Sequence, residues 1–93
     1  MSLLFVLPGA LQPLAGERAE IRLDGNAASV GAALDLLWSE TPAVRDRVVD
    51  ELGHVRAHVN VFVDGENVRD TGGLSTPVRD GAEILILAAV SGG

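Results

Sequence analysis

The chain has 93 residues, 47% of them hydrophobic, and a formal net charge of −6. This length and composition predict one folded domain, residues 1–93, and no hydrophobic run approaches the roughly 20 residues of a membrane-spanning helix. The absence of cysteine excludes disulfides, thiolate metal sites and a cysteine nucleophile, and the acidic charge argues against a nucleic-acid partner.

Two strands and a helix are predicted in the first half of the chain. Residues 3–7 form an apolar run that stops at Pro8, which indicates a strand inside the sheet. Residues 19–23 alternate between apolar and charged side chains and predict a half-buried strand. Ser29 is a good N-cap for a helix that extends to about Glu40. Its apolar face recurs with helical spacing at Val30, Ala33, Leu34, Leu37 and Trp38.

The second half is predicted to contain a short helix, two strands and an irregular segment. The expected ranges are 43–52 for the helix, with Gly53 as its C-terminal cap, 55–63 and 83–89 for the strands, a tight turn at 64–67, and 68–77 for the irregular segment. The first and last strands are apolar on both faces, so we pair them as parallel neighbours in the sheet centre. This order predicts an α+β protein with a β-grasp fold, a mixed sheet packed on one amphipathic helix plus a short second helix.

The last strand has a candidate partner interface on its outer face. If its two isoleucines face the helix, Leu85 and Leu87 point outward, because alternate residues of a strand face opposite ways. Phe62 has the matching parity on its own strand. Exposed neighbouring apolar side chains indicate an interface. The alternative is that the loops at 9–18 or 68–77 cover this face.

The chain ends in four residues that we predict to form a flexible tail, Val90, Ser91, Gly92 and Gly93. Our hypothesis is that the carboxylate of Gly93 is the reactive group and that Val90, Ser91 and Gly92 are recognised by a partner enzyme. Glycine has no β-carbon, so the walls of a narrow channel can close on the backbone. The alternative is that the terminal glycines are frayed and have no function.

The C-terminal third resembles the ubiquitin-like sulfur carriers of the ThiS/MoaD family, and within it the CysO-type carriers of cysteine biosynthesis. The resemblance rests on Val68-Arg69, Gly72-Gly73-Leu74, the Asp80-Gly81 turn and the final Ala89-Val90-Ser91-Gly92-Gly93. Ala88 departs from the pattern, because relatives often have proline at that position.

The resemblance implies a reaction cycle. A ubiquitin-activating-type enzyme adenylates Gly93 with ATP, a sulfur donor converts the adenylate to a thiocarboxylate, and the thiocarboxylate passes sulfur to a second enzyme. That acceptor is a pyridoxal-phosphate cysteine synthase, with a metallopeptidase acting later, or the large subunit of molybdopterin synthase. The chain itself is then a protein cosubstrate with no cofactor, and we expect it in the cytoplasm because the start shows no targeting segment.

Several alternatives stay open. The chain could be the small subunit of molybdopterin synthase, a carrier for tRNA thiolation or natural-product sulfur, a ubiquitin-like protein modifier, or an interaction module with an inert tail. His54 and His58 are four residues apart, but they flank Val55 at the entry to a predicted strand and have no carboxylate at ligand spacing, so no metal site is predicted. All seven cations are arginines. Arg69 and Arg79 could steer an acidic partner segment, although surface ion pairs usually contribute little.

Overall fold

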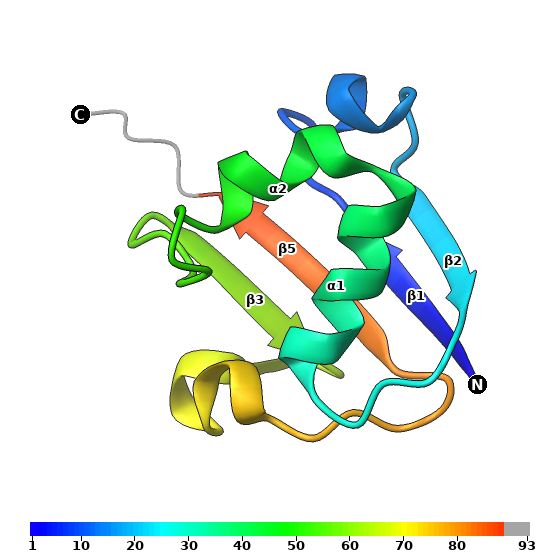
Figure 1. Cartoon of the computed structure of the whole chain (residues 1–93), viewed down its shortest axis with the longest axis vertical. Coiled ribbons are helices and arrows are strands. Elements are labelled where there is room, and N and C mark those ends of the chain that lie inside the picture. Colours follow the sequence, from blue (N-terminus) through cyan, green and yellow to red (C-terminus); the bar gives the residue numbers. More distant parts are fainter. Residues whose placement is uncertain (89–93) are drawn as a thin grey trace.

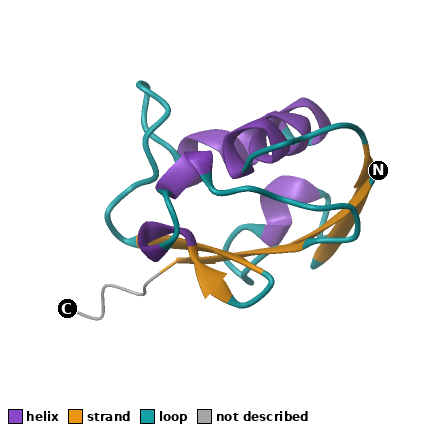
Figure 2. Cartoon of the chain, turned by 90° about the horizontal axis from the view of Figure 1, so that it is seen from below, coloured by secondary structure: helices purple, strands orange, loops and turns teal. Residues whose placement is uncertain are grey.

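The computed structural model describes residues 1–88, and the residues from 89 to 93 lie outside the described part. A five-stranded mixed sheet has both α-helices on one side (Figures 1 and 2). The elements are β1 (Ser2–Val6), η1 (Gln12–Ala15), β2 (Glu20–Asp24), α1 (Val30–Glu40), α2 (Pro42–Val48), β3 (Val59–Val63), β4 (Glu66–Asn67), η2 (Val68–Asp70), η3 (Gly73–Ser75) and β5 (Glu83–Ala88), where η denotes a 3-10 turn.

The strands follow the order β2-β1-β5-β3-β4. β5 lies in the middle, parallel to β1 and antiparallel to β3, and the β1–β2 and β3–β4 pairs are antiparallel. This arrangement confirms the predicted α+β class, the β-grasp and the parallel pairing of the first and last strands. None of the described helices has the length and apolar character needed to cross a membrane.

Helix α1 packs on the sheet through its apolar face. The buried residues of this face are Val30, Ala33, Leu34 and Leu37. Ser29 is the N-cap of the helix, as predicted, and its Oγ accepts a hydrogen bond from the Ala32 amide at 3.2 Å. Trp38 is half-buried at the core edge. On the facing strand β5, Ile84 and Ile86 are fully buried, so this side of the sheet is the core.

Two predicted boundaries between α2 and β3 are wrong. The helix expected to reach Leu52 ends at Val48, and the strand expected from Val55 begins at Val59. Val49 is extended, with φ −121° and ψ 157°, and forms an isolated antiparallel bridge with Val55. Val49, which we assigned to the helix, therefore pairs with Val55, which we assigned to the strand, across a turn.

The side chain of Asp50 organises this turn. One carboxylate oxygen, Oδ1, accepts hydrogen bonds from the amides of Leu52 and His54, both at 2.9 Å. Aspartate that bonds nearby amides competes with helix formation, which explains why α2 ends early. Gly53 has φ +84° and belongs to the turn, so our interpretation of Gly53 as a helix cap is wrong.

These bonds make the turn sensitive to acid. The hydrogen bond from the His54 amide is the main cause that holds the pKa of Asp50 below its ordinary value of 3.8. A carboxylate with a lowered folded-state pKa stabilises the fold above its unfolded pKa, and this contribution is lost as the pH falls through the folded-state pKa.

We therefore expect the Asp50→Asn variant to lose less stability on acidification than the wild type, because asparagine keeps the acceptor oxygen without the titrating charge. Urea unfolding at pH values above and below 3.8 measures the difference. Equal losses of unfolding free energy in the two proteins would contradict this role of the carboxylate.

Two short features were not predicted. β4 contains only two residues and pairs with the end of β3, within the segment that we assigned to a tight turn. The segment expected to be irregular contains the turns η2 and η3. With two or three residues each, these elements are too short to repeat a hydrophobic pattern, so the sequence carries no periodic signal for them.

Candidate partner-binding face and tail exit

Strand β5 has one buried side and one accessible side, as the alternation predicts. Leu85 is half-buried and Leu87 is 42% exposed, whereas Ile84 and Ile86, which alternate with them along the strand, are fully buried. Both α-helices lie on the isoleucine side of the sheet (Figure 2). The two leucines therefore belong to the sheet face that carries no α-helix.

Register pairs extend this accessible face across three strands. Leu85 of β5 lies opposite Phe62 of β3 and beside Val6 of β1, and all three side chains are half-buried. Leu4, two residues before Val6, has the same orientation and is also half-buried. We call these residues together with Leu87 the open face: Leu4, Val6, Phe62, Leu85 and Leu87. The structure thus brings together the three predicted interface residues, Phe62, Leu85 and Leu87, and sequence reasoning missed Leu4 and Val6.

The loops named as alternative covers leave Leu87 accessible. The segment at 9–18 connects β1 to β2, and the segment at 68–77 follows β4. Neither covers Leu87 completely, because its side chain remains 42% exposed. Within residues 1–88, Met1, Leu52 and Leu87 are the large hydrophobic side chains classed as exposed. Of these three, Leu87 is the one that lies on β5, one residue before the end of the strand at Ala88.

Asparagine and arginine side chains form the polar border of the open face beside Leu87. Asn60 lies opposite Leu87 in the β3–β5 register. Its Oδ1 accepts hydrogen bonds from Asn67 Nδ2 at 3.2 Å and from Arg69 Nε at 3.3 Å. This network fixes the position of the border next to the exposed leucine.

The end of β5 has a neighbour on one side only. The parallel ladder with β1 stops at the pair Val6–Leu85, and Pro8, which has no N–H, comes where the ladder would continue. The Glu83 carbonyl accepts a hydrogen bond from the loop after β3, so odd-numbered residues of β5 direct their backbone groups toward β3. Ala88 directs its amide to the other side, where no residue of the described chain accepts it.

This geometry predicts that proline is tolerated at the strand exit. We expect Ala88→Pro to change the free energy of unfolding by less than about 1 kcal/mol, because no hydrogen bond is lost and the unfolded chain is stiffened. Leu87→Pro is the matched control, since its amide faces Asn60 in the ladder, and we expect it to cost more than about 2 kcal/mol. Chemical denaturation measures both, and equal damage would show that the Ala88 amide is bonded.

The predicted tail residues Val90, Ser91, Gly92 and Gly93 lie outside the described residues. The structure places the end of β5 beside the open face, and the chain continues from Ala88 toward these residues. Their roles stay predictions. Within residues 1–88, no group of three or more His, Cys, Asp or Glu side chains is placed to hold a metal ion.

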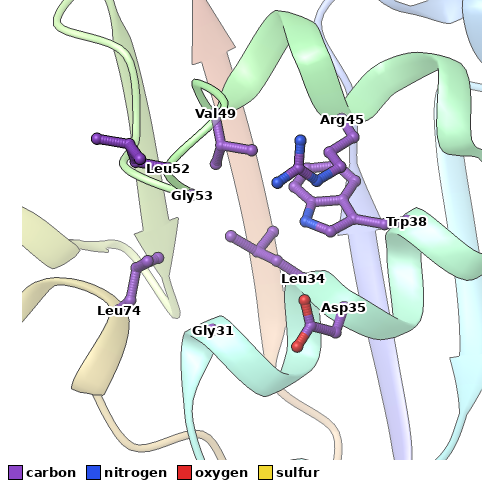
Figure 3. A pocket seen from close by; sticks show the side chains of 9 residues that line it. All are labelled: Gly31, Leu34, Asp35, Trp38, Arg45, Val49, Leu52, Gly53 and Leu74. Carbon is purple, nitrogen blue, oxygen red and sulfur yellow. The ribbon is translucent and has the colours of Figure 1, made fainter.

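A separate groove lies on the helix side of the molecule (Figure 3). Its volume is about 280 Å³, and its walls come from α1, from α2 with the following turn, and from η3. The lining residues are Gly31, Leu34, Asp35, Trp38, Arg45, Val49, Leu52, Gly53 and Leu74. The predicted interface residues Phe62, Leu85 and Leu87 are not among them.

Comparisons with known proteins agree with this fold. The model of the ThiS family matches residues 5–93. The sulfur carrier protein CysO of Mycobacterium tuberculosis is 32% identical over 95 residues, which covers 100% of both chains. Small archaeal modifier protein 1 of Haloferax volcanii is 36% identical over 84 residues, which covers 89% of this chain and 91% of the relative. The solved BexX/CysO complex of Amycolatopsis orientalis contains a chain with TM-score 0.86 and 31% identity, covering 98% of this chain and 99% of that one.

Proposed function

Because the chain belongs to the ThiS family of ubiquitin-like sulfur carriers and modifiers, we propose that it is a sulfur carrier whose reactive group is the carboxylate of Gly93. The observation that carries the proposal is the open face. It places the exposed Leu87 at the end of β5, directly before the segment that leads to Gly93. An enzyme that binds this face receives the tail at its active site.

The chemistry requires a partner that activates the carboxylate. A carboxylate is a poor acyl electrophile, because oxide or hydroxide would have to leave. One oxygen of Gly93 attacks the α-phosphorus of ATP, pyrophosphate leaves, and an acyl-adenylate forms. A hydrosulfide equivalent from a sulfur donor then attacks the acyl carbon, AMP leaves, and one proton is released to give the thiocarboxylate. The requirement for ATP favours the cytoplasm as the location.

The tail has the length and the composition to reach into such an active site. Four extended residues, Val90 to Gly93, reach roughly 13 Å at about 3.3 Å each. The two terminal glycines have no β-carbon, so channel walls can approach and hydrogen-bond the backbone. The chain thus acts as a protein cosubstrate, and its partners supply the catalytic groups.

We assign the delivered sulfur to cysteine biosynthesis. The full-length similarity to the CysO carrier supports this assignment. The acceptor is then a pyridoxal-phosphate cysteine synthase, and a metallopeptidase releases cysteine and regenerates the carboxylate of Gly93. Molybdopterin synthase is the runner-up acceptor, with this chain as its small subunit.

A protein modifier is the second candidate function, and the similarity to small archaeal modifier protein 1 favours it. In that case the activated carboxyl of Gly93 is attacked by an amine of another protein, and an amide bond forms as AMP leaves. Carrier and modifier share the activation step and differ in the nucleophile that follows.

Intact mass spectrometry after coexpression with the activating enzyme and a sulfur source tests the proposal. A carrier gains the mass of sulfur in place of oxygen, and a variant that lacks Gly92 and Gly93 gains nothing. A modifier appears as conjugates on lysines of other proteins. An unmodified chain in the presence of an active activating enzyme would contradict both functions.

A further inference from the structure

Arg69 is a cation that has no acidic partner in the described structure. Its guanidinium donates three hydrogen bonds, all to neutral oxygens: Nη2 to the Val59 carbonyl at 2.6 Å, Nη2 to the Arg56 carbonyl at 3.0 Å, and Nε to Asn60 Oδ1 at 3.3 Å. Within residues 1–88 no aspartate or glutamate forms an ion pair with it. The positive charge is therefore held in place without being compensated.

The short strand β4 explains why an arginine lies there. β4 pairs with only the last two residues of β3, so the edge of β3 at Val59 has no neighbouring strand. The guanidinium takes the place of that strand by binding the Val59 carbonyl. An edge occupied by a charged side chain is also protected from pairing with other chains.

Arg69 is exposed at the border of the open face. Asn60 connects it to this face, because Asn60 lies opposite Leu87 and accepts a hydrogen bond from Arg69 Nε. A partner that covers Leu87 therefore also approaches the guanidinium. The contact excludes water that would otherwise screen the charge, so the guanidinium attracts a partner carboxylate more strongly there.

We infer that Arg69 is the electrostatic anchor of the open face, and that the partner enzyme places an aspartate or glutamate carboxylate against its guanidinium. The inference rests on the proposed function. The three existing hydrogen bonds already restrict the arginine side chain. Binding of the carboxylate therefore costs little additional side-chain entropy.

The net charge of the chain makes this contact selective. At a net charge of −6 the protein repels acidic surfaces in general. A partner surface that is basic overall, with one carboxylate facing Arg69, matches this charge distribution. Glu20 is exposed and lies opposite Val6 in the β1–β2 register, so a partner carboxylate placed there is repelled, which discriminates against wrong orientations.

Charge-removing variants test the inference. Arg69→Gln removes the charge and keeps an amide that can donate hydrogen bonds, and Arg69→Lys keeps the charge but loses the planar fork. Arg79→Gln is the matched control, because Arg79 is also exposed and without an ion pair in the described chain, but precedes β5 at its opposite end. Arg69→Gln and Arg79→Gln change the net charge equally, so a difference between them reports position.

The measurement is the Kd for the purified activating enzyme that forms the thiocarboxylate on the wild type, at about 50 mM and about 500 mM NaCl. We expect Arg69→Gln to weaken binding about tenfold at low salt and much less at high salt, Arg69→Lys to recover most of that loss, and Arg79→Gln to bind within about twofold of the wild type. Thermal unfolding of each variant reports the separate effect on the β3 edge.

Two results would overturn the inference. One is equal affinity of Arg69→Gln and Arg79→Gln. The other is a loss at Arg69 that is the same at both salt concentrations and that Arg69→Lys does not recover, which is the behaviour of a purely structural residue. Failure of the wild type to form a thiocarboxylate would instead contradict the proposed function.

Discussion

The Gly92→Ala variant is expected to lose activation by the adenylating enzyme by about 100-fold while its stability stays that of the wild type. Under the proposed function, an added β-carbon meets the wall of a partner channel that closes on the glycine backbone, and the Gly93 carboxylate is then displaced from ATP. The substituted position follows β5 in the sequence, and the core residues that the structure describes all precede it. ATP–pyrophosphate exchange measures the adenylation step alone.

Ser91→Ala is the control for this prediction. That position already has a β-carbon, so we expect exchange within about twofold of the wild type. Normal exchange by Gly92→Ala would contradict the recognition of a side-chain-free backbone. Reduced exchange by Ser91→Ala to the same extent would show that the tail is read through its side chains.

The Leu87→Asp variant is expected to abolish binding to the activating enzyme, with Kd raised more than about 100-fold. Under the proposed function, the change places a carboxylate in a contact that excludes water. The side chain of Leu87 is 42% exposed in the free protein, so its loss costs the fold only about 1 kcal/mol. Isothermal titration calorimetry measures the binding, and thermal unfolding measures the stability.

Leu52→Asp is the matched control for Leu87→Asp. Leu52 is 77% exposed, but it lies at the groove on the helix side. We expect this variant to bind the activating enzyme like the wild type. Equal loss of affinity at both positions would contradict the assignment of the open face, and a fall in Tm by much more than about 8 °C for Leu87→Asp would place that side chain in the core.

Much of the fold could be predicted because periodic burial leaves a periodic sequence. Helix α1 has apolar residues at the spacing of its buried face, strand β5 was predicted from its continuous apolar run, and the structure confirms both elements. The orientation of Leu85 and Leu87 could be predicted only on the condition that Ile84 and Ile86 face the helix, because alternate residues of a strand face opposite ways. The chain from Val48 to Val59 could not be predicted by this means, because the Val49–Val55 bridge and the Asp50 turn break the period.

Less of the candidate site could be predicted, because part of it depends on contacts between distant residues. Leu4 and Val6 join the open face through the pairing of β1 with β5, which local spacing does not specify. The position of Arg69 depends on how far β4 extends along β3. Local signals were limited to strand parity, which places Asn60 and Phe62 on the same face of β3, opposite to the buried valines, and likewise separates the leucines of β5 from its isoleucines.

The end of β5 carries both the exposed Leu87 and the start of the segment that leads to Gly93. Under the proposed function, the enzyme that loads sulfur and the enzyme that unloads it compete for this one surface, so no ternary complex forms. Carrier that has given up its sulfur keeps the same surface. It therefore competes with sulfur-loaded carrier for the acceptor enzyme. Pathway flux then depends on the stoichiometry of carrier to acceptor, with an optimum above which additional carrier slows turnover.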